Sequence, residues 1–188
     1  MKKIISLFAR NYKTDHLVRN EIVPGAEWVV DGEGVATGKF DGTACMIKDN
    51  KMFKRYDVKK NRQTPPDFIP SADPDEVTGH WPGWVPVGDG PEDKWHREAF
   101  ETHKKFDGIF ELCGPKIQGN PEGYEKHVLI SLNTEDRADD FIIQPPREFE
   151  GLKIFFEHYN IEGIVWHHPD GRMVKIKARD FGIKRRGN

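Results

Sequence analysis

Four short segments of this sequence combine charged side chains with apolar neighbours in patterns that suit chemistry. A free lysine has a pKa of about 10.4 and is mostly protonated, but burial or nearby cations can make it a nucleophile. Lys39 stands two residues before an Asp-Gly turn and close to an apolar run, so it is a candidate nucleophile or an ordinary turn lysine. The four segments are Lys39-Phe40-Asp41-Gly42-Thr43, Phe110-Glu111-Leu112, Ile161-Glu162-Gly163-Ile164-Val165 and Lys175-Ile176-Lys177.

The other three segments supply groups that such a lysine would need. Glu111 and Glu162 lie in apolar, strand-like runs, and glutamate is rarely buried without a partner. Each one therefore predicts a ligand hydroxyl, a metal ion or a basic side chain nearby, unless it faces solvent from an edge strand. Lys175 and Lys177 share one face of a predicted strand, because side chains alternate with a period of two. Two ammonium groups on one face favour a bound phosphate, the alternative being a solvated sheet face.

The pattern of apolar and turn residues predicts mostly short strands with two main helices. This mixture indicates a single α+β domain over residues 1–188, built on antiparallel sheet. Strands are predicted at 28–30, 43–47, 51–56, 109–113, 128–132, 163–166 and 173–177, and helices at 92–105 and 147–159.

Several aromatic residues allow two interpretations. Segment 63–91 is rich in Pro, Gly and Asp and is expected to form a long ordered loop or insertion. Its Trp81 and Trp84, together with Trp95, would stack on RNA bases or pack in the core. His167-His168 in the predicted final hairpin would bind a metal or, more commonly, lie exposed in the turn.

Composition limits the classes of function. The net charge of −2 argues against a protein that coats nucleic acid by bulk charge, although basic clusters within 51–62 and 172–188 could guide phosphates or simply be solvated. No apolar run approaches the roughly 18 residues of a membrane span. Cys45 and Cys113 lie in apolar runs without a CxxC motif, which favours reduced core thiols and a cytoplasmic location.

In their order and spacing, the four segments resemble the motifs of the covalent nucleotidyltransferases, the superfamily of polynucleotide ligases and messenger-RNA capping enzymes. The segment from Lys39 resembles motif I, and Arg55 on the following strand resembles the arginine of motif Ia. The segments at Glu111, Glu162 and Lys175 resemble motifs III, IV and V. Thr43 after motif I and the compact ending are more similar to RNA ligases. The resemblance implies the adenylation-domain fold, with antiparallel sheets flanked by helices and no C-terminal domain.

The resemblance also implies a mechanism. Lys39 would attack the α-phosphate of ATP, and the AMP would pass to an RNA 5′-phosphate before a 3′-hydroxyl seals the strand. Glu111 would bind the ribose, Glu162 would organise Mg²⁺ or Mn²⁺, and Arg55 would hold phosphate or ribose near the RNA end. The implied ATP site consists of Lys39, Asp41, Gly42, Arg55, Glu111, Lys175 and Lys177.

The sequence departs from the family pattern on both sides of Lys39. Thr37 and Gly38 stand where many relatives carry glutamate, so adenine would be read by backbone groups or by Thr37. Ala44 replaces an Arg or Asn, whose contact would come from Arg55 or Arg62. Two alternatives remain: a GTP-using capping-type transferase, and a non-catalytic module that binds RNA ends.

Overall fold

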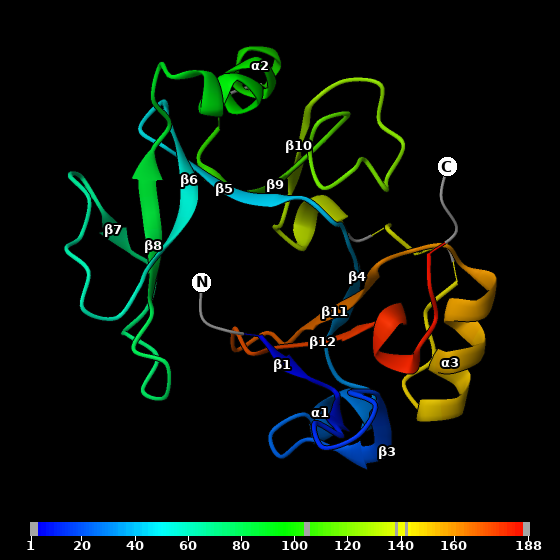
Figure 1. The fold of residues 1–188 in the computed structure, drawn as a ribbon. Coiled ribbons are helices and arrows are strands. Elements are labelled where there is room, and N and C mark those ends of the chain that lie inside the picture. The colour runs from blue at the N-terminus through cyan, green and yellow to red at the C-terminus, as the bar shows by residue number, and fades with distance from the viewer. Residues whose placement is uncertain (1–3, 104–105, 138, 142, 186–188) are drawn as a thin grey trace. The chain divides into compact units, whose positions relative to one another are not determined.

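The computed structural model describes residues 4–103, 106–137, 139–141 and 143–185. Their contacts divide the chain into two compact units (Figure 1). Unit 1 contains Asp41–Asn133, and unit 2 contains Ile4–Phe40 together with the chain from Thr134 onward. The chain therefore leaves unit 2 directly after Phe40 and returns to it at Thr134.

Unit 2 is built on a four-stranded sheet in the order β1-β12-β11-β4. The two central strands, β11 (Gly163–His167) and β12 (Met173–Lys177), form the predicted final hairpin. On the outer side of β11 lies β4 (Val35–Lys39), which is antiparallel to it. The short β1 (Ile5–Ser6) pairs in parallel with β12. Lys39 is thus the final residue of β4, an edge strand of this sheet.

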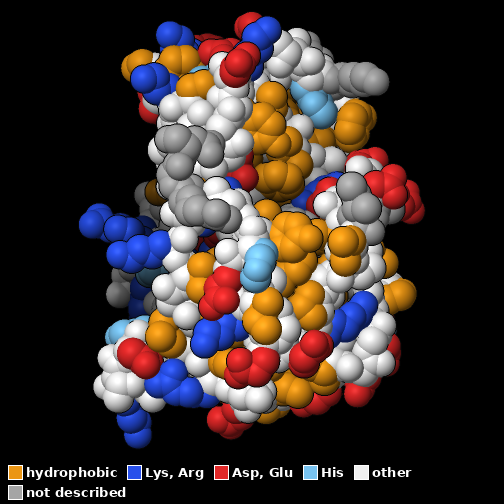
Figure 2. Space-filling model, turned by 90° about the vertical axis from the view of Figure 1, so that its right-hand side faces the viewer, with side chains coloured by type: hydrophobic (Ala, Val, Ile, Leu, Met, Phe, Trp, Pro, Cys, Tyr) orange, Lys and Arg blue, Asp and Glu red, His pale blue; other side chains and the backbone are white. Residues whose placement is uncertain are grey.

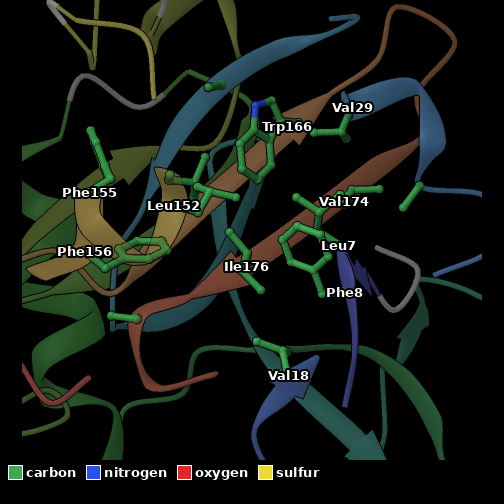
Figure 3. Packing of buried hydrophobic residues seen from close by; sticks show 14 of the residues in the cluster. Leu7, Phe8, Val18, Val29, Leu152, Phe155, Phe156, Trp166, Val174 and Ile176 are labelled. Carbon is green, nitrogen blue, oxygen red and sulfur yellow. The ribbon is translucent and has the colours of Figure 1, made fainter. Parts of the chain in front are cut away.

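One face of the unit 2 sheet is entirely apolar because every second residue of its strands points to that side. Helix α3 (Phe149–His158) covers this face, and Leu152, Phe155 and Phe156 supply its buried stripe. Figure 3 shows these helix side chains packed in one cluster with side chains of the sheet and of the N-terminal segment. The fully buried members from β11 and β12 are Ile164, Trp166, Val174 and Ile176.

The predicted strand at 28–30 is wrong: the structure forms a single helical turn there, α1 (Glu27–Val30). The β-branched and aromatic composition favours a strand locally, but tertiary packing decides otherwise. Trp28 and Val29 are neighbours and are both buried. A helical turn can direct two successive side chains toward the core, whereas a strand would point them to opposite sides. Arg147 fixes the exit from this turn by donating to the carbonyl oxygens of Val29 (2.9 Å) and Gly34 (3.0 Å). Unit 2 also contains the antiparallel pair β2 (Phe8–Arg10) and β3 (Val18–Ile22), and the 3₁₀ turns η2 (Glu135–Arg137) and η3 (Ala178–Phe181).

Unit 1 is built on a six-stranded antiparallel sheet in the order β10-β9-β5-β6-β8-β7. The predicted strands near 43–47, 51–56, 109–113 and 128–132 are confirmed, although their ends differ by one or two residues. They are β5 (Thr43–Lys48), β6 (Lys51–Val58), β9 (Gly108–Cys113) and β10 (Val128–Ser131). Cys45 and Cys113 are buried and free, as expected from their apolar surroundings.

Segment 63–91, expected to form a loop, instead contributes two strands to this sheet. β8 (Trp81–Pro86) pairs with β6 along its whole length, and β7 (Ile69–Pro70) forms the edge. The proline content misleads here because these prolines lie at strand ends and near the sheet edge, where a missing N–H is tolerated. Trp84 is buried and belongs to the packing of the unit.

A helix over 92–105 is confirmed in its described part. The 3₁₀ turn η1 (Pro91–Asp93) leads directly into α2 (Lys94–Thr102), while the predicted end at Lys105 lies outside the described residues. The basic cluster within 172–188 likewise extends beyond residue 185, past the described part of the chain.

The surface carries both signs of charge. Acidic and basic side chains are interspersed over the face drawn in Figure 2, which agrees with the net charge of −2. Within the described ranges, the structure contains no helix with the length and apolar character needed to cross a bilayer.

Helix α3 provides a matched test of the unit 2 core. Leu152 is fully buried, whereas Ile154 on the same helix is 55% exposed. We expect Leu152→Ala to lower the free energy of unfolding by about 2 to 5 kcal/mol, because it leaves a cavity. Ile154→Ala should change it by less than about 0.5 kcal/mol. Urea unfolding followed by circular dichroism would measure both, and equal losses would contradict this packing.

Candidate functional site

The face of the unit 2 sheet opposite the core carries the polar side chains. The strand register sets them in rows, because Gly163 on β11 pairs with both Lys39 on β4 and Lys177 on β12. In the next row, Val165 pairs with Thr37 and Lys175 in the same way. The third row consists of Val35, His167 and Met173. The pattern Lys175-Ile176-Lys177 thus places its lysines on this face, as predicted, with Ile176 in the core.

Glu162 joins two of these lysines. It directly precedes β11, and its carboxylate Oε2 accepts a hydrogen bond from Lys39 Nζ at 2.7 Å. Its Oε1 accepts one from Lys177 Nζ at 2.6 Å. Glu162 is only 7% exposed, so these contacts are weakly screened by solvent. The predicted neighbourhood of Lys39, Glu162 and Lys177 is therefore present in unit 2, and Glu162 has the basic partners that a buried carboxylate requires.

Lys175 adds a third positive charge to this face. Burial, and then the charges of Lys177 and Lys39, hold its pKa below the usual value for lysine. In the described part of the chain, Lys175 forms no ion pair within 4.0 Å. Lys39 and Lys177 thus share the Glu162 carboxylate while Lys175 has no ion pair in the described structure, and the face has an excess of positive charge that an anion such as phosphate would balance.

Gly163 allows the strands to approach closely at this point. A Cβ atom at this position would lie 2.3 Å from the carbonyl oxygen of Ile176 on β12, a distance that side chains do not reach. Any larger residue would therefore push β11 away from β12. Because Glu162 is the preceding residue, such a shift would also move the carboxylate between Lys39 and Lys177.

Thr37, which is buried, and His167, which is partly buried, form a second contact on the same face. The Thr37 hydroxyl lies 2.9 Å from His167 Nε2, and Thr37 is 1% exposed. Burial, followed by the positive charge of Arg137, lowers the pKa of His167, while Asp140 acts in the opposite direction. The expected turn position is wrong for His167, which ends β11 and contacts Thr37. The alternative metal role of His167-His168 stays a prediction.

Unit 1 contains the Asp-Gly turn that begins two residues after Lys39. The backbone N–H of Gly42 donates to Glu111 Oε1 at 3.2 Å, and the N–H of Asp41 donates to Glu122 Oε1 at 2.9 Å. A Cβ at Gly42 would lie 2.3 Å from the carbonyl oxygen of Leu112. The Asp-Gly turn is therefore packed directly against β9, and the structure brings together the predicted Asp41, Gly42 and Glu111.

Arg55 lies on β6, as predicted, and it contacts Asp57 and Trp84, which are not among the predicted site residues. Its Nε donates to Asp57 Oδ1 at 2.9 Å, and its guanidinium stacks 5.7 Å from the ring centre of Trp84. Nearby on the same strand, Lys54 binds the buried carboxylate of Asp93 at 2.5 Å. Part of the 51–62 basic cluster therefore has a structural partner and is not a free charged surface.

The proposed RNA-stacking tryptophans lie in different surroundings. Trp84 is buried, Trp81 donates from its indole N–H to the carbonyl oxygen of Ala72 at 2.9 Å, and Trp95 stacks on His127 with ring centres 4.6 Å apart. The core interpretation therefore holds for Trp84, whereas Trp81 and Trp95 are only partly buried.

Several residues near the site were missed by sequence reasoning. Glu122 follows a Pro in a turn-rich loop, and Arg137 and Asp140 lie in an acidic, polar stretch that reads as solvent-exposed. Their contacts depend on long-range folding, so spacing alone does not reveal them. The His167 contact was detectable in principle. Thr37 lies two residues before Lys39 and His167 lies five residues after Glu162, and alternation along the two strands places both side chains on the same sheet face.

Comparisons with known proteins were made for the whole chain. No protein-family model matches it. A Mus musculus protein and a Pongo abelii protein, both named RNA ligase 1, are each 27% identical to it over 220 residues, which cover 79% of this chain and 67% of the relative. A Danio rerio protein with the same name is 30% identical over 146 residues, which cover 59% of this chain and 43% of the relative. The 220-residue alignments are longer than this chain, so those relatives carry segments that it lacks.

These relatives confirm the resemblance to the RNA ligases that the motifs indicate. They also agree with the observed mixture of antiparallel sheets and few helices, so the expected α+β fold is confirmed. The site residues themselves are assigned by motif and geometry.

The partly buried position of His167 predicts a pH dependence of stability. Its pKa is lowered in the folded protein, so below about pH 6.5 the unfolded chain binds a proton that the folded chain resists. Stability contributed by the neutral ring is therefore lost as the pH falls below 6.5. We expect His167→Gln to lose less stability than the wild type between pH 7 and pH 5 in urea unfolding. Parallel stability curves for the two proteins would contradict this expectation.

Proposed function

From its relationship to the RNA ligases, we propose that this chain joins RNA 5′-phosphate and 3′-hydroxyl ends with ATP, through a covalent AMP on Lys39. The observation that supports this most directly is the cationic face of unit 2. Lys39 lies there with Lys175 and Lys177, and Glu162 binds both Lys39 and Lys177. A nucleophilic lysine beside phosphate-binding lysines suits attack on a nucleotide phosphate.

In the first step, Lys39 Nζ attacks the α-phosphorus of ATP. A nitrogen–phosphorus bond forms, the bond to the bridging oxygen breaks, and pyrophosphate leaves. The ammonium must first lose a proton, and Glu162 Oε2 lies 2.7 Å from Nζ, within reach of that proton. Lys175 and Lys177 stabilise the negative charge that develops on the phosphate oxygens.

In the next two steps, AMP moves and then leaves. A 5′-phosphate oxygen of RNA attacks the phosphorus of the lysyl–AMP, which forms a phosphoanhydride and releases the Lys39 amine. The 3′-hydroxyl of the second RNA end then attacks the 5′-phosphorus, a phosphodiester forms and AMP departs. Although the pKa of Lys175 is lowered, its side chain can still bind phosphate, because a bound anion favours the protonated, charged form of the lysine.

We propose that magnesium or manganese binds here together with the nucleotide phosphates, as a weakly held ion. Within the described ranges, no group of three or more His, Cys, Asp and Glu side chains is placed to hold a metal. Mg²⁺ commonly uses one or two carboxylates, several waters and substrate phosphates. Glu162 would supply the carboxylate, and the ion would neutralise phosphate charge.

The residues of unit 1 have supporting roles in this proposal. Glu111 would bind the ribose hydroxyls as a hydrogen-bond acceptor, from its place beside the Asp-Gly turn. Arg55 would hold phosphate or ribose near the RNA end, and its planar guanidinium is well suited to an oxyanion. Asp41 and Gly42 shape the turn after the nucleophile, which the contacts to Glu122 and Glu111 hold in place.

The covalent step is tested by mass spectrometry. Incubation with ATP and magnesium should increase the mass of the protein by one AMP, and Lys39→Ala should abolish the increase because the nitrogen nucleophile is absent. Lys153→Ala, which changes an exposed lysine on α3, is the matched control and should keep the adduct. An adduct that survives Lys39→Ala would overturn the assignment. Labelled GTP in the same assay would distinguish a capping-type enzyme.

The role of Glu162 gives a second test. We expect Glu162→Gln to lower the single-turnover rate of adduct formation by about 10²- to 10⁴-fold at saturating ATP and magnesium, because the proton acceptor is lost. Glu157→Gln on the exposed side of α3 should leave the rate unchanged. Recovery of the full rate simply by raising the magnesium concentration would indicate that Glu162 acts through metal binding alone.

A further inference from the structure

The edge of the unit 2 sheet next to Lys39 is closed by two charged side chains. β4 is the edge strand of this sheet, so within the described residues the N–H and C=O groups on its outer side have no strand partner. At Gly38, the N–H donates to Asp140 Oδ2 at 2.8 Å, and the C=O accepts from Arg137 Nη2. Both backbone groups of the residue before the nucleophile are therefore held by side chains from one short segment.

Arg137 also contacts the residue that follows Lys39. Its guanidinium lies over the ring of Phe40, 4.9 Å from the ring centre. The same guanidinium forms an ion pair with Asp140. Arg137 thus contacts Gly38 on one side of Lys39 and Phe40 on the other, while Asp140 fixes Arg137 and Gly38 together.

We infer that Arg137 and Asp140 are positioning residues for Lys39, an inference that rests on the proposed function. On its inner side, Lys39 pairs with Gly163 of β11. On the outer side, the Arg137–Asp140 pair fixes the neighbouring peptide groups. The backbone at the nucleophile is therefore restrained from both sides, which limits the positions that Nζ can take beside Glu162.

The burial of Arg137 supports a role beyond protection of a strand edge. Arg137 is only 6% exposed, and its Nε has no hydrogen-bond partner in the described part of the structure. A buried charge with an unsatisfied donor is costly, and apolar residues of similar size often stabilise a fold as well or better. The segment is already anchored by Phe141, which packs on the core and against Phe155 with ring centres 6.1 Å apart. Anchoring therefore does not require the charged pair.

Positioning of Lys39 matters for only part of the reaction. Attack on ATP needs Lys39 Nζ in line with the leaving pyrophosphate, and misplacement by about 1 Å can lower a rate by about 10²-fold. Sealing of an RNA that already carries AMP on its 5′-phosphate uses the 3′-hydroxyl as nucleophile and does not form a bond to Lys39. A defect in positioning should therefore separate the two reactions.

The test compares both reactions in Arg137→Met, Arg137→Lys and Asp140→Asn. For Arg137→Met we expect the single-turnover rate of Lys39 adduct formation to fall by about 10- to 100-fold at saturating ATP. Sealing of pre-adenylylated RNA should stay within about threefold of wild type. Arg137→Lys should recover part of the lost rate, because an ammonium can still donate to the carbonyl of Gly38. The recovery should be incomplete, because an ammonium lacks the planar fork with which a guanidinium binds Gly38 and Asp140 together.

Arg147→Lys is the matched control. Arg147 likewise binds backbone carbonyls in unit 2, at Val29 and Gly34, but it contacts neither neighbour of Lys39. The Arg147→Lys protein should form the Lys39 adduct near the wild-type rate, even if its melting temperature falls. If Arg137→Met does not fold, Arg137→Lys and Asp140→Asn decide the question by the same two rates.

The outcomes separate this inference from the proposed function. A wild-type protein that forms no AMP adduct would reject the proposed function itself. If the wild type forms the adduct and the variants form it at an equal or higher rate, the positioning role is rejected. Equal losses in adduct formation and in sealing would also reject it, because they would indicate a general structural defect.

Discussion

The shared carboxylate of Glu162 is the interaction on which the site in unit 2 depends. Three lysines lie on neighbouring positions of one sheet face, and their like charges repel one another because the face is partly buried. Glu162 binds Lys39 and Lys177 through separate oxygens, so the ends of β4 and β12 are linked across the start of β11. Lys175 remains without an ion pair in the described structure, and this excess charge makes the face receptive to an anion.

The sheet satisfies two opposing requirements by alternation. One face of β11 and β12 carries Ile164, Trp166, Val174 and Ile176 and packs under α3, while the other carries the cationic groups. The apolar face provides the rigidity that keeps the lysines close despite their repulsion. Gly163 is the point where this arrangement has no room for a side chain, because the carbonyl of Ile176 lies where a Cβ would stand.

The sequence predicts the parts of this protein that depend on local pattern. The period of two at Lys175-Ile176-Lys177 places the lysines correctly, and the apolar runs around Glu111 and Glu162 indicate carboxylates with partners. The α1 turn at Glu27–Val30 was missed because Trp28 and Val29 favour a strand in isolation, and only tertiary burial selects the helix. β8 was missed because proline and glycine hide a strand that pairs along its length with β6.

The contacts that hold the site were less accessible from sequence. Arg137 and Asp140 contact Gly38 across 99 and 102 positions of the chain, and Thr37 and His167 meet across 130. Such contacts arise when separate segments fold together, and residue type alone does not encode the partner. Polar residues in a charged stretch look like surface until the fold closes over them, as it does over Arg137.

The order of the segments along the chain has a consequence for how the protein is made. Asp41–Asn133 is continuous, so unit 1 has all its strands once that stretch has emerged from the ribosome. β4 must wait for β11, its partner in the sheet, which is synthesised only after the whole of unit 1. Contacts of such large sequence separation form slowly, because a long loop must close first. During synthesis β4, which carries Lys39, is thus an unpaired strand, and the lysine face forms only when the final hairpin has been made.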